Sequence, residues 1–185
     1  LALAQARGLN CALRLGDARC LPYDAGFFDV VVSERAIINI LDPDGQMKAF
    51  ENIARVLKPG GQMVAIEGFK AGLENLNRAR ADFLLSPIPE PAFNNWFTQE
   101  RWEGFLTNGF REFTEAESGG LAPVNFLSSH YFITRCLHDA IKPAGGKVRN
   151  TEMARFFAAA LPPAGDYSPL RIKYIRRVAA VLDEC

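Results

Sequence analysis

The chain has 185 residues, enough to bury a hydrophobic core, and by its length is expected to form one domain. Its 49% hydrophobic and 23% charged residues are ordinary for a globular chain, and 21 basic side chains balance 21 acidic ones. This balance argues against a nucleic acid or an anionic membrane as partner, and no apolar run is long enough to span a bilayer.

The cysteines and the amino-terminal residues indicate a cytoplasmic protein. No two cysteines form a C-x-x-C pair, and no histidine stands near one at zinc-ligand spacing, so we expect free thiols and no bound metal. Leu1–Arg7 is rich in helix formers, and Gly8 favours a helix end there. The chain starts at Leu1 without a basic region or a cleavage site, so we expect it to begin in mid-domain and to lack a signal peptide.

The first expected strand is Cys11–Leu15, and Gly16 gives it a sharp exit. Asp17 would then stand just past the carboxyl end of that strand, which is the ligand edge of a doubly wound sheet. The alternative is that Asp17 only forms an Asx turn or caps a helix, as loop aspartates commonly do.

A second strand is predicted at Phe27–Ser33, whose nearly continuous apolar run is typical of a strand buried on both faces. An amphipathic helix follows, and the turn Lys58–Gly61 then has Pro and Gly at the positions that a type II turn requires. The apolar run Met63–Ile66 is the next buried strand, and Glu67 stands at its end, where it either touches substrate or, as we favour, caps the following turn.

Four short motifs give this stretch a family resemblance: Gly16-Asp17, Leu21-Pro22-Tyr23, Phe28-Asp29-Val30-Val31 and Arg55–Gly61. In this order they resemble the class I S-adenosylmethionine-dependent methyltransferases, specifically over about residues 1–70. The resemblance implies an α/β fold with a Rossmann-like sheet and helices on both faces. The family's Gly-rich first strand-turn-helix, and the acid that ends its second strand, have no counterpart, so it also implies a domain whose first strands are missing.

The resemblance also implies cofactor-binding residues for S-adenosylmethionine. An acid at the place of Asp17 accepts a hydrogen bond from the adenine amino group, and the next amide, that of Ala18, contacts the ring. The segment Ser33, Glu34 and Arg35 would face the methionine part, although Glu34 and Arg35 are equally well read as a solvated ion pair.

Substrate contacts are expected from a Pro-punctuated aromatic loop at 86–97, because long irregular loops are often functional. Its best polar and stacking groups are Asn94, Asn95 and Trp96. The competing interpretation is that Trp96 and Phe97 anchor the loop on the core.

The remaining elements complete the domain. They are a Thr98-capped helix to Leu106, a strand at 110–117, a helix at 127–141, a helix at 151–161 with Met153, Phe156, Phe157 and Ala160 inward, and a last strand at 170–178. We expect Lys142–Gly146 to separate the two later helices. About 50 residues are thus inserted before the last strand, and we predict a single partial domain over 1–185 with substrate-side insertions at 70–108 and 124–168.

The predicted activity is methyl transfer to a small molecule, with oxygen as acceptor atom in a sugar or secondary metabolite. His130 is the candidate general base because it follows two serines, with Tyr131 and Arg135 as pocket residues; a lone helical histidine is more commonly a packing or surface residue. Motifs of hydrolases, kinases and metalloproteases are missing. The alternative function is a non-catalytic remnant or interaction module. In either case we expect Cys11–Leu15 to be displaced and Phe27–Ser33 to form an exposed edge through which the chain self-associates.

Overall fold

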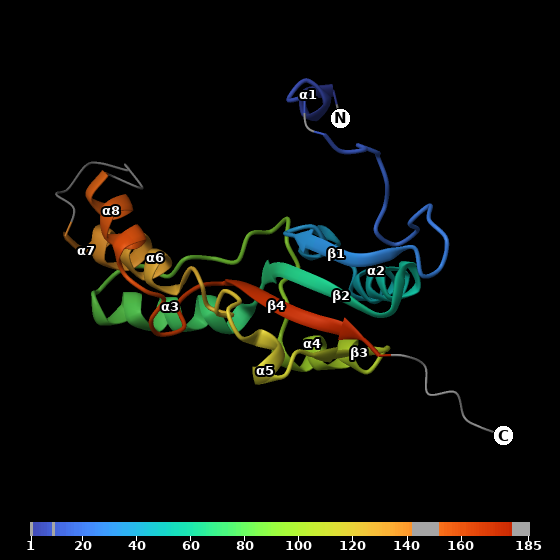
Figure 1. The fold of residues 1–185 in the computed structure, drawn as a ribbon. Coiled ribbons are helices and arrows are strands. Elements are labelled where there is room, and N and C mark those ends of the chain that lie inside the picture. Colours follow the sequence, from blue (N-terminus) through green and yellow to red (C-terminus); the bar gives the residue numbers. More distant parts are fainter. Residues whose placement is uncertain (1, 9, 142–151, 179–185) are drawn as a thin grey trace.

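The computed structural model describes residues 2–8, 10–141 and 152–178. Within them, four strands form one mixed sheet in the order β1-β2-β4-β3 (Figure 1). β1 pairs in parallel with β2, and β4 runs antiparallel to both β2 and β3. The strands are β1 (Phe28–Glu34), β2 (Leu57–Gly68), β3 (Phe110–Glu112) and β4 (Leu170–Arg177).

Helices connect these strands and form a separate group beyond the carboxyl ends of β1 and β2. That group contains α3, α6, α7 and α8, at the left of Figure 1. The predicted helix at 127–141 is confirmed as one continuous stretch with a π-helical turn in its middle. The helices are α1 (Ala2–Gln5), η1 (Ile37–Asn39), α2 (Pro43–Val56), α3 (Lys70–Asp82), α4 (Gln99–Leu106), α5 (Glu115–Ser118), α6 (Ser128–Phe132), η2 (Ile133–Leu137), α7 (His138–Ile141) and α8 (Glu152–Ala160).

The core lies between one face of the sheet and the helices α2 and α4. Phe50 of α2 stacks on Phe105 with ring centroids 4.4 Å apart, and meets Trp102 edge-on at 5.6 Å. Met63 and Ala65 supply the sheet side of this core. Because burying an aromatic side chain contributes about 1.5–3 kcal/mol, these rings hold the helices to the sheet.

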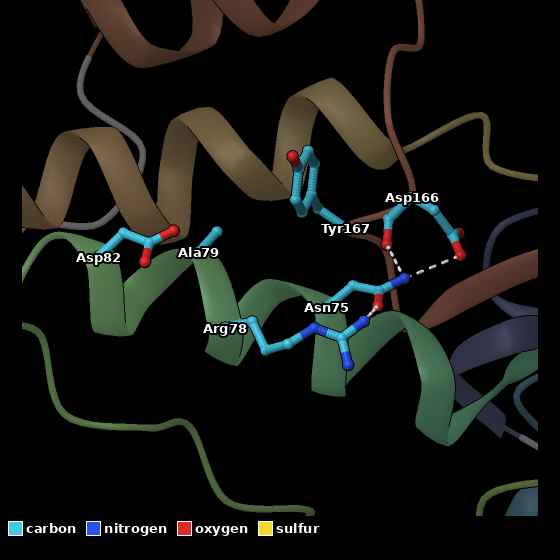
Figure 2. A pocket seen from close by; sticks show the side chains of 6 residues that line it. All are labelled: Asn75, Arg78, Ala79, Asp82, Asp166 and Tyr167. Atoms are coloured by element: carbon cyan, nitrogen blue, oxygen red, sulfur yellow. Dashed lines mark hydrogen bonds between the residues drawn. The ribbon is translucent and has the colours of Figure 1, made fainter.

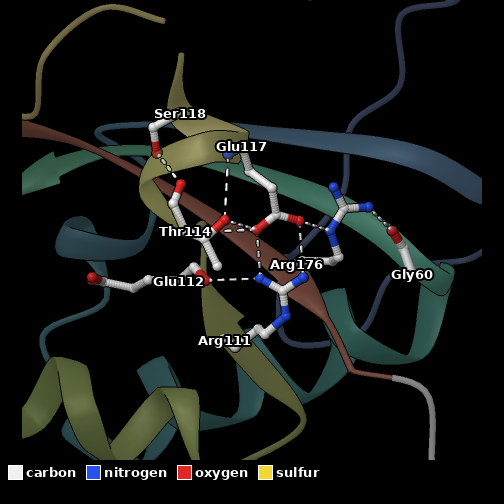
Figure 3. A network of polar contacts seen from close by, with 7 residues as sticks. All are labelled: Gly60, Arg111, Glu112, Thr114, Glu117, Ser118 and Arg176. Atoms are coloured by element: carbon white, nitrogen blue, oxygen red, sulfur yellow. Dashed lines mark hydrogen bonds and ion pairs between the residues drawn. The ribbon is translucent and has the colours of Figure 1, made fainter.

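The opposite face carries an ion-pair network around α5 (Figure 3). Arg111 and Arg176 are directly opposite each other on β3 and β4, and Glu117 accepts from both, at 2.7 Å and 3.1 Å. Arg176 also donates to the carbonyl of Gly60 at 2.9 Å. The network therefore connects α5 with the turn at the start of β2.

The turn predicted at Lys58–Gly61 lies inside the amino-terminal part of β2. Gly60 has a φ of +75°, which favours glycine, and a Cβ on Gly61 would lie 2.8 Å from the carbonyl oxygen of Lys58. Lys58 donates to the Asp29 carboxylate at 2.7 Å, beside the irregularity in the β1–β2 register. Asp29 is tolerated in β1 because its side chain is exposed, with Lys58 beside it.

The strand predicted at Phe27–Ser33 is an edge strand, as expected, but it is not buried on both faces. Among the described residues no strand pairs with the outer side of β1, and Val30 and Val32 are 49% and 63% exposed. Cys11–Leu15 forms no strand, which corrects that prediction. The segment runs away from the sheet toward α1, so its expected displacement is confirmed (Figure 1).

Two further predictions were wrong in part. The strand at 110–117 ends at Glu112, because Thr114 and Glu117 form a capping box that starts α5. In α8, Phe156 and Phe157 are 68% and 47% exposed rather than inward, and Ala160 is exposed as well. The Lys142–Gly146 break lies outside the described residues.

Candidate functional site

The candidate site lies where β1 and β2 end side by side. Because the two strands are parallel, their carboxyl ends reach the same edge of the sheet, with Ser33 opposite Ala65 and Glu34 opposite Ile66. The next residues, Glu67 on β2 and the turn before η1 on the other side, therefore meet at this edge.

Glu67 is fully buried and binds the loop that follows β1. Its Oε1 accepts from the Ser33 hydroxyl at 2.5 Å and from the amides of Ala36 and Ile37 at 3.3 Å. Its Oε2 accepts from the amide of Ile38 at 3.2 Å. One carboxylate thus satisfies three backbone donors at the start of η1, which a 3₁₀ turn by itself leaves unpaired.

Burial and hydrogen bonding have opposite effects on this carboxyl. Burial has the larger effect and raises the pKa of Glu67, while the Ser33 hydroxyl and the three amides act to lower it. The sequence had favoured Glu67 as the cap of the next turn, but the structure assigns it to the preceding loop. The sequence showed an acid at the end of a buried strand, which marks a candidate site residue. It did not show that the loop after β1 would be the partner of Glu67.

Arg35 follows β1 in a left-handed conformation, with φ +50°. Its amide donates to the carbonyl of Ile66 at 2.8 Å, which continues the β1–β2 ladder past the last strand residue. Left-handed backbone is uncommon for residues other than glycine and concentrates at functional sites. The side chains of Glu34 and Arg35 are exposed and lie 3.4 Å apart, so the solvated pair is what the structure contains, at the ligand edge.

Asp17 stands in a tight turn closed by the bond from the Cys20 amide to the Asp17 carbonyl. Its carboxylate accepts from the Arg19 amide at 2.9 Å and from the Arg19 guanidinium at 2.6–3.1 Å. The guanidinium first, and then the amide, lower the pKa of Asp17 to about 2. This half-exposed carboxylate is ionised at neutral pH and borders a surface cavity of about 550 Å³ beside the start of α2, together with Gly45 and Lys48.

The Pro-rich loop is tied to the loop after β1 by its two asparagines. Asn94 donates to the side chain of Asn39 at 2.6 Å, and Asn95 donates to the carbonyl of Leu41 at 3.0 Å. Trp96 is buried against the backbone of Gly68, and its indole Nε1 has no hydrogen-bond partner among the described residues. The structure brings these three predicted residues to the end of β2.

His130, Tyr131 and Arg135 lie together on the helical stretch beyond the sheet edge. The Arg135 guanidinium is 5.3 Å from the centre of the Tyr131 ring. Burial raises the pKa of Tyr131, and Arg135 and then Arg35 oppose that rise. Burial first, and then Arg135, lower the pKa of His130, so its half-buried imidazole is neutral at pH 7.

The two serines that precede His130 bind the loop that follows α8. The Ser128 hydroxyl donates to the carbonyl of Ala164 at 2.7 Å, and the Ser129 hydroxyl donates to that of Pro162 at 2.6 Å. They therefore hold the loop that follows α8. Sequence reasoning could not find this role, because the partners lie more than 30 residues away.

The described residues contain neither a membrane-spanning helix nor a metal-binding cluster. In the stretches 2–8, 10–141 and 152–178, no helix combines the length and apolarity needed to cross a membrane. Over the same described residues, no three His, Cys, Asp or Glu side chains are grouped so as to hold a metal ion.

Replacing Glu67 tests its role in fixing the loop. We expect Glu67→Ala to lower the free energy of unfolding by about 2–5 kcal/mol, because four donors lose their acceptor. Urea unfolding measures the change. Glu74→Ala, at an exposed position of α3, is the control and should change stability by less than about 0.5 kcal/mol.

The raised pKa of Glu67 also predicts how the free energy of unfolding changes with pH. A raised pKa means that the folded state binds the Glu67 proton more tightly than the unfolded state does. The stability of the wild type relative to Glu67→Gln should therefore fall as the pH rises from 4.5 through the folded-state pKa. A relative stability that rises over this range would show that the hydrogen bonds outweigh burial.

Comparison with known proteins agrees with this geometry. Residues 1–61 match the family model described as a methyltransferase domain, and no curated protein matches the chain. Among solved structures, the chain is similar to an S-adenosylmethionine-dependent methyltransferase from Methanosarcina mazei, with 16% identity and a TM-score of 0.51, over 96% of this chain and 76% of that one.

Two other structures show the same likeness. One is a methyltransferase of this kind from Thermotoga maritima, described as a possible histamine N-methyltransferase, with 15% identity and a TM-score of 0.53 over 96% of this chain and 68% of that one. The other is the 4+2 cyclase SpnF, with 18% identity and a TM-score of 0.50 over 96% of this chain. The chain spans 60% of the length of SpnF, and at these identities the likeness is one of fold. Residues 1–61 thus match a methyltransferase domain, and the fold of the whole chain is similar to that of S-adenosylmethionine-dependent methyltransferases.

Proposed function

We propose that the chain takes part in methyl transfer from S-adenosylmethionine to an oxygen atom of a small molecule, such as a sugar or a secondary metabolite. The observation that carries the proposal is the loop after β1, which Glu67 fixes at the carboxyl edge of β1 and β2. The helical stretch with His130 and Tyr131 lies on this side of the sheet (Figure 1).

The residues present fit the adenine side of the cofactor and one wall of its methionine side. The ionised Asp17 carboxylate is half-exposed and can accept a further hydrogen bond, as an adenine amino group requires, with the Ala18 amide beside it. The Ser33 hydroxyl is committed to Glu67, so Ser33 would contribute its backbone only. Glu34 and Arg35 are exposed at the edge and are the side chains available to the amino-acid part.

When bound, S-adenosylmethionine supplies a methyl group activated by its sulfonium sulfur, for transfer to the acceptor by in-line displacement. What the chain must supply is orientation, which in well-aligned pairs lowers the barrier by about 7–11 kcal/mol. We infer that the segments 70–108 and 124–168 hold the acceptor, through Asn94, Asn95, Trp96, Tyr131 and Arg135. Trp96 is buried in the core, so in this proposal it positions the loop, and the polar contacts to the acceptor come from the other four residues.

His130 is the proposed general base. Its half-buried imidazole has a lowered pKa and is unprotonated at neutral pH, as a base that accepts a hydroxyl proton must be.

Cofactor binding tests the proposal first. Calorimetric titration with S-adenosylmethionine should show weak binding, because the family's Gly-rich turn and the acid of its second strand have no counterpart here. Asp17→Asn should weaken it about tenfold further, since an amide is a poorer acceptor than a carboxylate. Arg19→Gln keeps the carboxylate and removes its partner, so it should retain affinity, as should Asp24→Asn at an exposed control position. No binding by the chain would contradict the proposal and favour a non-catalytic interaction module.

The role of His130 predicts a pH profile. His130→Ala should lower kcat about a hundredfold to ten-thousandfold with little change in KM for the cofactor. Because the pKa of His130 lies below the ordinary 6.5, the acid limb of the wild-type kcat profile should have its midpoint below pH 6.5. A His138→Ala variant serves as the matched histidine control for the profile. If the acid limb persists in His130→Ala, another group is the base.

The open edge of β1 supports a proposal on partners, namely that two copies pair through it. Unpaired strand edges with exposed apolar residues template association, and natural proteins block them with lysine. We expect concentration-dependent self-association by sedimentation, lost in Val32→Lys and kept in Val178→Lys, an exposed valine beyond β4. A wild type that is monomeric at all concentrations would refute pairing through this edge.

A further inference from the structure

The loop at 162–167 is fixed to the start of α6 by two hydroxyl groups. Ser128 Oγ accepts from the amide of Tyr167 at 2.9 Å while it donates to the carbonyl of Ala164. Ser129 Oγ accepts from the amide of Ala164, also at 2.9 Å, while it donates to the carbonyl of Pro162. Each hydroxyl uses its donor and an acceptor site, so the loop has a defined shape against the helix.

The same loop is fixed to α3 on its other side (Figure 2). Asn75 Nδ2 donates to the carbonyl of Asp166 at 2.9 Å and to its carboxylate at 3.1 Å. The close approach depends on Gly72, because a Cβ there would lie 1.9 Å from the carbonyl oxygen of Ser168. Asp166 and Tyr167 are therefore held in place between α3 and α6.

Two cavities border this loop and have Tyr167 as a common wall. The first, of about 290 Å³, is polar and is lined by Asn75, Arg78, Ala79, Asp82, Asp166 and Tyr167. The second, of about 360 Å³, is mainly apolar and is lined by Ser129, Phe132, Ile133, Leu137, Leu161, Ala164, Gly165 and Tyr167. Phe132 packs on the Tyr167 ring with centroids 4.8 Å apart, which gives the second cavity an aromatic end.

The polar cavity contains two charges without an ionic partner among the described residues. Asp166 is compensated by Arg171 at 2.6 Å and by Asn75. Arg78 contacts the neutral side chain of Asn75. Neither Arg78 nor Asp82 has an oppositely charged group within 4 Å in the part of the chain that the structure describes. One helix turn thus offers both a guanidinium and a carboxylate to the same cavity.

The apolar cavity takes two of its walls from the π-helical turn. Ile133 and Leu137 both belong to η2, and π-helical turns inside α-helices are rare and frequent at functional sites. The hydroxyl of Ser129 donates its proton to the loop, so this side chain has no donor left to bind a ligand. This cavity suits a hydrocarbon or an aromatic ring.

We propose that the adjoining cavities form a binding site for a small zwitterion with an apolar side chain, that is, a hydrophobic α-amino acid. Arg78 binds its carboxylate and Asp82 its ammonium group, while the side chain lies against Tyr167 and enters the cavity beside η2. The site is separate from the proposed methyl transfer and does not depend on it. A ligand with a single charge would leave one of the two side chains without a partner.

Titration calorimetry with L-phenylalanine and three analogues tests the site in the full chain without S-adenosylmethionine. For a ligand of this size we expect a Kd of about 1 mM. Phenethylamine lacks the carboxylate, 3-phenylpropanoate lacks the ammonium group, and L-alanine lacks the ring. Each should bind about tenfold more weakly or not measurably. No saturable binding of L-phenylalanine, or equal binding of any analogue, would overturn the proposal.

Substitutions locate the binding. Arg78→Gln and Asp82→Asn lie on the exposed side of α3, so the fold should survive, and each should weaken L-phenylalanine binding about tenfold. Arg7→Gln and Asp24→Asn make the same changes at exposed positions outside the cavity and should leave the Kd unchanged. Unfolding midpoints equal to that of the wild type establish that the variants are folded. Unchanged affinity in both cavity variants would place any binding elsewhere and refute this site.

Discussion

The buried carboxylate of Glu67 is the interaction on which the carboxyl edge of the sheet depends. It joins the end of β2 to the Ser33 hydroxyl on β1 and to the first amides of η1. An isolated carboxylate would be costly to bury, and four donors offset that cost while fixing the path of the chain out of β1. Arg35, in its left-handed conformation, lies between the segment that Glu67 binds and the hydrogen bond from its own amide to the carbonyl of Ile66.

The Pro-rich loop packs against the segment after β1 that Glu67 fixes. Its asparagines bind Asn39 and Leu41, and Gln46 of α2 donates to the carbonyl of Asn95 at 2.7 Å. Trp96 and Phe97 then enter the core, with the Phe97 amide bound to Gly68 at 2.9 Å. Glu67 at the end of β2 therefore fixes the loop after β1, and that loop in turn positions the Pro-rich loop, which forms one wall of the candidate site.

The helical layer beyond the sheet is organised by different contacts. Arg80 of α3 is buried and donates to Asp139 at 2.8 Å, to the carbonyl of Ser86 at 2.9 Å and to that of Arg135. A buried arginine needs several acceptors, and this one takes them from the loop after α3 and from the helical stretch of η2 and α7. The layer is thus attached to the sheet through α3 and the loop at 162–167, and its cavities lie between those attachments.

The elements with strong local signals could be predicted from the sequence. These include the Thr98-capped helix, the glycine with positive φ before the Met63–Ile66 run, and the family motifs of the first 61 residues. It also indicated the open edge at β1, because the family places further strands there. Capping, turn and periodicity signals act over a few residues, so they can be read without the fold.

The pairing of polar groups, in contrast, depends on the folded arrangement of distant segments. Glu67 was read as a local cap, and Ser128 and Ser129 as neighbours of a catalytic histidine, yet each binds backbone about 30 or more residues away. The outward faces of Phe156 and Phe157 likewise depend on what packs against α8, not on their spacing. A buried polar group takes whatever partner the fold brings within hydrogen-bond distance, and that choice is set by long-range packing rather than by its neighbours in the chain.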